Sequence, residues 1–212
     1  TEQFNITPEK ITHCSNGISM QQFYQLTQVD YHSTSKIFKR KCVSYIGNIG
    51  IAQNLITLIQ VAKQHPEVDF MIVGGGTDQT RIIEASKNLP NVEMVGRVEW
   101  HNVLSAYQKA DLLWAQLLPE FSGAVPSKLY EYLATGKRVI YGGCGEAIKT
   151  ISEFDDVQII EPNNVQALSL AIKQALIHDQ DFVINFNNRK KIEEKYLREL
   201  YVKLFYQRIF ER

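Results

Sequence analysis

Short apolar runs alternate with helical patterns along most of the chain. Runs rich in β-branched and aromatic residues predict six buried strands, at residues 42–47, 69–76, 91–96, 111–117, 137–143 and 156–161. Segments with apolar residues at helical spacing separate them, at residues 53–65, 77–88, 103–110, 127–136, 145–151 and 164–176. Burial is expected for one face of the first of these helices, which carries Leu55, Leu58, Ile59 and Ala62.

This alternation predicts the fold class. Strands that alternate with helices pair in parallel through right-handed crossovers, so the chain should form an α/β domain. We expect a doubly wound, mostly parallel, Rossmann-like sheet of about six strands, with Gly136 as the C-cap of the helix over residues 127–136. Because such sheets bind ligands at the carboxyl ends of their strands, functional residues are sought there.

The two flanks of this domain have a different pattern. Residues 1–40 contain one short predicted strand at residues 10–18, one helix at residues 19–26 and a polar stretch, which together are typical of a linker. Near the other end, residues 189–210 carry one long helical pattern. The sequence thus predicts a linker, an α/β domain and a terminal helix, over residues 1–40, 41–180 and 181–212.

Composition disfavours several classes of protein. The 212 residues are 44% apolar and 22% charged, as in an ordinary globular domain, and the formal net charge of zero disfavours a nucleic-acid partner. No apolar run is long enough to predict a membrane span, and the first residues lack a signal-peptide pattern. Cys14, Cys42 and Cys144 form no CxxC pair, which favours a reducing, cytoplasmic compartment.

Glycine-rich loops follow the first two predicted strands. The first loop runs from Gly47 through Asn48 to Gly50, before a helix, where glycines allow a phosphate to approach the backbone or simply make a tight turn. The second loop, Gly74 to Gly76, lacks the third glycine of a dinucleotide fingerprint because Gln79 stands there. The second loop therefore argues against NAD or FAD binding.

A third glycine cluster follows the fifth predicted strand. It includes Gly143, whose N–H group could meet a sugar or a phosphate, and it is followed by Glu146, whose carboxylate could accept from sugar hydroxyls. The alternative is a loop with an acidic residue that complements the start of the next helix.

The most informative segment runs from residue 120 to residue 136. Ser127 suits the start of a helix, whose free N–H groups attract anions, and Lys128 adds a positive charge beside it. One turn later, Glu131 shares a helical face with Ser127 and could accept hydrogen bonds from two vicinal ribose hydroxyls. These residues predict a nucleoside-diphosphate site, the alternative being a solvated polar face.

Metal and cofactor motifs are absent from the sequence. The five histidines are scattered without a pair at metal-ligand spacing, and no phosphate-binding P-loop lysine motif is present. We therefore expect neither a metal nor a cofactor.

Read in order, these motifs resemble a known enzyme family. The segments GNIG, IVGGGT, NVEMVGRV, SKLYEYLATGKRVI and GGCGE are similar to those of retaining GT-B glycosyltransferases of family 4. The wording SKLYEYLATGK is most similar to that of bacterial enzymes that build surface polysaccharides. The resemblance covers roughly residues 10 to 205, and the segment around Glu131 is its most specific part.

The resemblance implies an organisation and partners. Residues 41–180 would be the donor-binding, C-terminal domain of such an enzyme, and residues 1–40 would leave its N-terminal domain. Residues 181–212 would be the helix that crosses back onto that domain. The N-terminal domain would hold the acceptor and any peripheral contact with the inner face of the membrane. This chain alone is then expected to be inactive.

The resemblance also implies a role for each candidate residue. Donor contacts would be made by Gly47, Asn48, Gly50, Gly96, Arg97, Val98, Ser127, Lys128, Glu131, Gly143 and Glu146. Within this set, the first loop and the helix start would hold the diphosphate of a UDP-sugar, residues 96–98 would border the base, and Glu131 would hold the ribose. No catalytic residue is assigned, because part of the active site would lie in the other domain.

Two positions depart from the family pattern. Many relatives carry an acidic residue eight positions before the ribose glutamate, where this chain has Gly123, and Glu120 is the nearest acid and the catalytic candidate. Many also carry a basic residue just after the first loop, where Ile51 stands.

Two other functions remain open at this stage. A nucleotide-sugar epimerase relative would need a complete site within one chain, whereas a glycosyltransferase half would need a second domain. A non-catalytic nucleotide-binding module is the other alternative, and Gly123 and Ile51 favour it.

Overall fold

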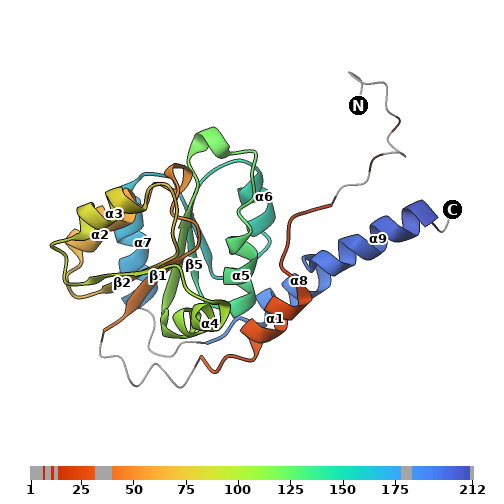
Figure 1. Cartoon of the computed structure of the whole chain (residues 1–212), viewed down its shortest axis with the longest axis horizontal. Coiled ribbons are helices and arrows are strands. Elements are labelled where there is room, and N and C mark those ends of the chain that lie inside the picture. The colour runs from red at the N-terminus through yellow and green to blue at the C-terminus, as the bar shows by residue number, and fades with distance from the viewer. Residues whose placement is uncertain (1–6, 8–10, 12–13, 32–39, 178–182, 211–212) are drawn as a thin grey trace.

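The computed structural model describes residues 7, 11, 14–31, 40–177 and 183–210 (Figure 1). Its centre is a six-stranded sheet with the order β3-β2-β1-β4-β5-β6. Every neighbouring pair of strands is parallel. The strands are β1 (Cys42–Ile46), β2 (Asp69–Val73), β3 (Val92–Gly96), β4 (Leu112–Gln116), β5 (Val139–Gly142) and β6 (Val157–Ile160). The predicted doubly wound α/β fold is therefore confirmed.

Helices cover both faces of this sheet, as Figure 1 shows. Those between the strands are α2 (Ile56–Gln64), α3 (Gln79–Ser86), α4 (Trp100–Lys109), α5 (Lys128–Thr135), α6 (Glu146–Ile151) and α7 (Val165–Ile177). Short 3₁₀ turns, η3 (Ile51–Gln53) and η4 (Pro119–Phe121), follow β1 and β4. One buried apolar cluster joins the sheet to α2, α3 and α7, and the other joins it to α4, α5 and α6.

The sequence pattern predicted these buried faces well. Leu55, Leu58, Ile59 and Ala62 are all buried, as their spacing indicates. Gly136 ends α5 with a φ of 73°, the left-handed C-cap conformation that glycine adopts most readily.

The flanking segments differ from the prediction. The single helix over residues 189–210 is wrong, because α8 (Phe186–Lys195) and α9 (Arg198–Phe210) are separate helices. A backbone pairing interrupts them: the N–H of Ile18 donates to the carbonyl of Tyr196 at 3.0 Å, and the N–H of Arg198 donates to Ile18 at 3.0 Å. Hydrogen bonds to Ile18 thus replace those of a continuous helix.

The strand predicted over residues 10–18 is also not formed in the part that the structure describes. There, Ile18 makes one isolated bridge with Leu197, and the remaining described residues of the segment lie outside any strand. The predicted helix is present as α1 (Met20–Thr27). Its Phe23 and Leu26 are buried in the apolar cluster that joins the sheet to α4, α5 and α6. The sequence predicted this helix but missed the pairing of Ile18 with the segment between α8 and α9.

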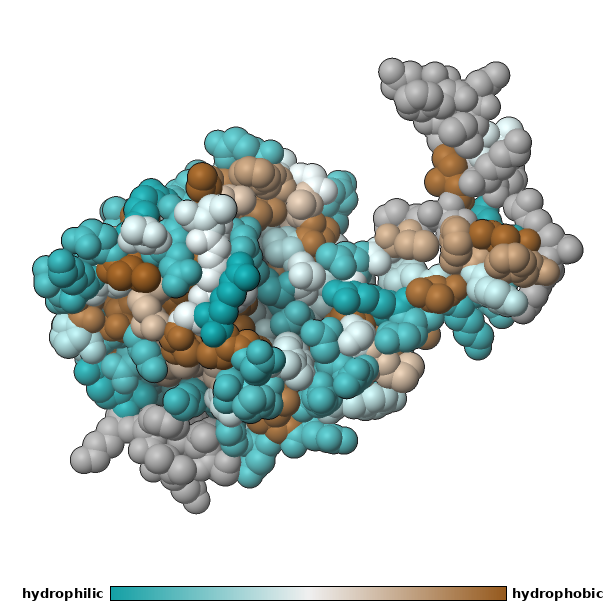
Figure 2. Space-filling view, viewed as in Figure 1, coloured by the Kyte–Doolittle hydropathy of each residue, from teal (hydrophilic) through white to brown (hydrophobic). Residues whose placement is uncertain are grey.

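Helix α9 projects from the body of the protein (Figure 1) and has no buried residue. Apolar side chains line it, and several are seen in brown on this projecting arm in Figure 2. Among the described residues, no helix is both long and apolar enough to cross a bilayer.

Candidate functional site

The candidate site lies where the sheet reverses its winding. Strands β1 and β4 are neighbours, and the helix after β1 covers one face of the sheet while the helix after β4 covers the other. Loops that leave two such strands diverge and open a crevice at the carboxyl ends, which is where doubly wound proteins bind ligands. The first glycine loop, after β1, and the start of α5, after β4, lie at this position, with Lys128 packed against Gly47.

The first two glycine loops interlock through backbone atoms. The N–H of Gly47 donates to the carbonyl of Val73 at 2.8 Å, and the N–H of Ile49 donates to Gly75 at 3.0 Å. Gly74 has a φ of +136°, and a Cβ there would lie 1.9 Å from the carbonyl oxygen of Gly47. The second glycine loop therefore supports the first through backbone contacts. This structural role accounts for its three consecutive glycines without a bound dinucleotide.

Lys128 reaches from the first turn of α5 to the first loop. A Cβ on Gly47 would lie 2.9 Å from the Lys128 amine, so the lysine packs directly against this glycine. The amine donates a hydrogen bond to the hydroxyl of Tyr45, which itself donates to the carbonyl of Asn48. Burial lowers the pKa of Lys128 to about 7, and the nearby Glu131 carboxylate opposes this shift.

Glu131 lies one turn further along α5 and is held by a second phenol. The hydroxyl of Tyr107, a fully buried residue of α4, donates to Oε2 of Glu131 at 2.9 Å. Burial raises the pKa of Glu131, while Tyr107 and the charges of Lys128 and Arg198 act against this rise. The other carboxylate oxygen makes no hydrogen bond within the described part of the chain and is free to accept from a ligand.

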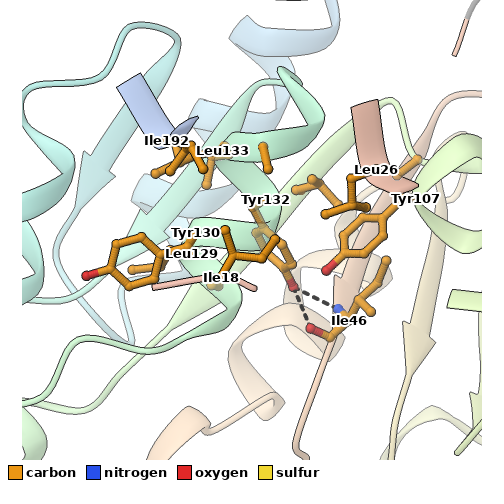
Figure 3. Close-up of a cluster of buried hydrophobic side chains, with 14 of the residues drawn as sticks. Ile18, Leu26, Ile46, Tyr107, Leu129, Tyr130, Tyr132, Leu133 and Ile192 are labelled. Atoms are coloured by element: carbon orange, nitrogen blue, oxygen red, sulfur yellow. Dashed lines mark hydrogen bonds between the residues drawn. The ribbon is translucent and has the colours of Figure 1, made fainter. Parts of the chain in front are cut away.

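A third phenol fixes α5 relative to β1. Tyr132 accepts a hydrogen bond from the N–H of Ile46 at 2.8 Å and donates to its carbonyl at 3.0 Å, as the dashed lines in Figure 3 show. Its ring meets that of Tyr107 edge to face, with centroids 5.9 Å apart. The helix start therefore has a fixed position relative to the strand that carries the first loop.

The remaining predicted residues of this region lie around the same crevice. Ser127 is at the N-cap position, is exposed and makes no capping hydrogen bond with its side chain. Asn48 is exposed in the first loop, and the N–H of Gly50 is bonded to the side chain of Gln53 at 3.1 Å. These groups leave the mouth of the crevice polar.

The predicted base-binding residues end β3, beside the second loop. The carbonyl of Gly96 accepts from the N–H of Gly74 at 2.8 Å. Arg97 is exposed and lies across Gly75, since a Cβ there would be 2.9 Å from its Nε atom. Val98 is partly buried against the core. Arg97 is thus the cation of this set that faces the glycine loops.

The third glycine cluster is tied to the loop after β4. Gly143 is buried over the ring of Tyr141, and the N–H of Glu146 donates to the carbonyl of Ser122 at 2.9 Å. The Glu146 carboxylate pairs with Lys149 at 2.6 Å on its own helix. Glu146 thus agrees with the alternative in which an acidic residue complements the start of the next helix.

The acidic candidate and the two departures lie at exposed positions of the segments that follow β1 and β4. Glu120 is exposed on η4 and makes no hydrogen bond or ion pair with the described residues. A Cβ on Gly123 would meet nothing within 4 Å, and Ile51 is 66% exposed. The structure does not bring Glu120 into the Lys128–Glu131 network.

The sequence missed three residues that shape the site. Tyr45 and Tyr107 look like ordinary core residues, and Gln116 ends an apolar run. Gln116 is buried and connects η3 to the loop before α7: its amide donates to the Gln53 carbonyl at 3.2 Å and accepts from the Asn163 N–H at 2.8 Å. A polar tip on an otherwise apolar strand was the available signal.

The opposite edge of the sheet also has a hollow, of about 580 Å³, lined in part by Arg40, His65 and Glu67. On its lining, His65 already contacts Glu67 at 3.0 Å, and its other ring nitrogen contacts Ser169 at 2.7 Å. The carboxyl edge is the better candidate because its lysine and glutamate keep unused hydrogen-bonding atoms. No metal-binding group of three or more His, Cys, Asp or Glu exists among the described residues.

A cation, a carboxylate and interlocked glycine loops lie together at the switch point, where doubly wound α/β domains bind their ligands. The family model for glycosyl transferases group 1 matches residues 30–196, and the chain belongs to this family. An uncharacterized glycosyltransferase of Haemophilus influenzae is 20% identical over 159 residues, which are 73% of this chain and 44% of that protein.

Solved glycosyltransferase structures have the same fold. The glycosyltransferase from Rickettsia africae superimposes with a TM-score of 0.78 at 16% identity, over 99% of this chain and 60% of that one. Anabaena HepE in complex with UDP gives a TM-score of 0.77 at 15% identity, over 100% of this chain and 60% of that one. The chain therefore spans between 44% and 60% of the length of these relatives.

Proposed function

We propose that this chain is the donor-binding domain of a glycosyltransferase that uses a nucleoside-diphosphate sugar, specifically a UDP-sugar. The observation that carries the proposal is the placement of Lys128 and Glu131 one turn apart on α5, beside the first glycine loop. The lysine suits a diphosphate, and the free carboxylate oxygen suits a ribose hydroxyl. A structural relative crystallised with UDP supports the choice of base.

The proposed chemistry is stabilisation of a leaving group. When the bond from the sugar to the diphosphate breaks, negative charge grows on the diphosphate. The positive end of the α5 dipole and the Lys128 amine would stabilise this charge, and fixed groups do so without reorganisation. We further propose retention of configuration, membership in glycosyltransferase family 4 and a role in surface polysaccharide synthesis, all on the family resemblance, together with a cytoplasmic site of action.

A second domain of the parent protein would supply the acceptor. Holding donor and acceptor in one geometry can contribute roughly 7–11 kcal/mol to lowering a barrier, and the donor site alone does not provide this. We therefore expect no sugar transfer by residues 1–212. Transfer at rates comparable to those of the full-length parent protein would contradict this part of the proposal.

Binding measurements test the donor site directly. Calorimetry should detect UDP with a dissociation constant in about the micromolar-to-millimolar range, as expected for half of a closed cleft. UDP should also raise the unfolding midpoint. Glu131→Ala should weaken binding while the fold persists. The absence of heat and of a midpoint shift with UDP, GDP and their sugars at millimolar concentration would refute the proposal.

The non-catalytic module remains the second candidate because of Ile51 and Gly123. Ile51 is largely exposed and offers no charge at the mouth of the site, and Gly123 offers no carboxylate. UDP binding combined with no transfer by the full-length parent protein would favour this candidate.

A further inference from the structure

Tyr45 occupies an unusual place under the first glycine loop. It is the fourth residue of β1, its side chain is fully buried, and its ring packs against Trp114 with centroids 5.9 Å apart. Two polar partners meet its hydroxyl: the carbonyl of Asn48 in the loop and the amine of Lys128 on α5. One phenol thus contacts both elements that flank the crevice.

The hydrogen-bond directions give the phenol a defined role. A tyrosine hydroxyl has one proton, and here it is donated to the Asn48 carbonyl. The lone pairs of the oxygen therefore face Lys128, which must be the donor. Burial raises the pKa of Tyr45 above its ordinary value, so the phenol keeps its proton and this direction at neutral pH.

Besides this hydrogen bond, the Lys128 amine lies 4.0 Å from the centroid of the Tyr45 ring. Within the described part of the chain, Tyr45 is its hydrogen-bond partner, and no carboxylate lies within ion-pair distance. The charged group that influences it is Glu131 on the same helix, which in turn receives the Tyr107 hydroxyl. Since an ammonium has three donors, two remain for a ligand.

We propose that Tyr45 is a positioning residue, whose phenol holds the Lys128 amine against the Gly47 loop so that its remaining donors meet a donor phosphate. A lysine stem rotates freely, and a fixed amine loses less freedom when the ligand arrives. The same hydroxyl also fixes the loop through Asn48, so the two phosphate-binding elements are set together. This inference rests on the proposed function.

The test compares ligands with and without phosphates. Tyr45→Phe keeps the buried ring and removes the hydroxyl. UDP should bind roughly 10-fold more weakly, as expected for loss of a hydrogen bond to a charged group, whereas uridine affinity should stay within about twofold. Tyr141→Phe is the matched control, because the Tyr141 hydroxyl is buried at the same edge without a hydrogen-bond partner in the described structure.

A double-mutant cycle separates positioning from general structural support. If Tyr45 acts through the amine, Tyr45→Phe should weaken UDP binding less in a Lys128→Met background than in wild type. Equal weakening of UDP and uridine, or an undiminished effect in that background, would overturn the inference. Lys128→Met also tests the contact from its other end without touching the buried ring.

A measurement without any ligand keeps this inference distinct from the proposed function. NMR titration of the Lys128 amine in the free chain should show a changed pKa and chemical shift in Tyr45→Phe, and unchanged values in Tyr141→Phe. If the wild-type chain bound no UDP, the proposed function would be refuted. The contact between the Tyr45 hydroxyl and the Lys128 amine would still be tested by this titration. A pKa and a chemical shift of the Lys128 amine that are the same in wild type and in Tyr45→Phe would overturn the inference.

Discussion

The lowered pKa of Lys128 makes donor affinity depend on pH. Its pKa of about 7 means that the amine is only half charged in the free chain at neutral pH. A diphosphate binds the ammonium form, so the apparent dissociation constant is the intrinsic value divided by the charged fraction. That fraction falls from about 90% at pH 6 to about 9% at pH 8, and affinity should therefore fall about tenfold over this range.

Calorimetry with a nucleotide sugar is the appropriate assay, because each of its two phosphates carries one ester bond and shares the anhydride bond, so neither titrates in this range. Repeating the measurement in buffers of different ionisation enthalpy counts protons, and about 0.9 proton should be taken up per ligand at pH 8. Lys128→Met should bind more weakly with no pH slope. Lys87→Met, which changes an exposed lysine of an i,i+3 pair with Glu84, should behave as wild type.

The result that would refute this reasoning is specific. Affinity that is flat between pH 6 and pH 8, with no proton uptake and with equal values for wild type and Lys128→Met, would remove Lys128 from the phosphate site. A slope that persists in Lys128→Met would assign the titration to another group.

Three further outcomes concern stability. Burial lowers the pKa of Lys128 from its ordinary 10.5 to about 7. Its contribution to the free energy of unfolding is therefore complete above pH 10.5 and is lost as pH falls through about 7. Lys128→Met should then be more stable than wild type at pH 6, and this difference, measured by urea titration, should narrow toward pH 10. Burial raises the pKa of Glu131, so its carboxylate costs stability at neutral pH, and Glu131→Gln should raise the thermal midpoint while UDP binds roughly 10-fold more weakly; a lowered midpoint would contradict this. Gly74→Ala should cost about 3 kcal/mol or more of unfolding free energy because of its φ and its contact with Gly47, whereas Gly123→Ala, with open space around it, should be nearly neutral.

Local pattern was sufficient to predict the sheet and its helices. Each strand is a short apolar run that ends near a loop signal, and residues such as Leu55 and Leu58 repeat at the helical period. Gly136 follows the last periodic residue of its helix, as a C-cap does. These features depend on neighbours in sequence, which is why a single chain reveals them.

The errors arose where distant segments meet. The helical period runs through Tyr196 without interruption, yet the chain breaks there to bond with Ile18, a residue 178 positions away in sequence. The same limit applies to the site. Ser127, Lys128 and Glu131 could be proposed from one helix, whereas Tyr45 and Tyr107 join it from other elements, and nothing local distinguishes them from core aromatics.

The shape of the interlocked glycine loops is set mainly by main-chain contacts. Val73 and Gly75 hold the first loop by backbone bonds, and absent β-carbons at Gly74 and Gly76 make room for it. The side chain of Ile51, which begins η3 directly after that loop, is 66% exposed and contributes little to its form. That side chain can therefore be replaced during evolution or engineering without changing the backbone of the loop. A basic residue at position 51 would add charge at the mouth of the crevice without rebuilding the loop beneath it.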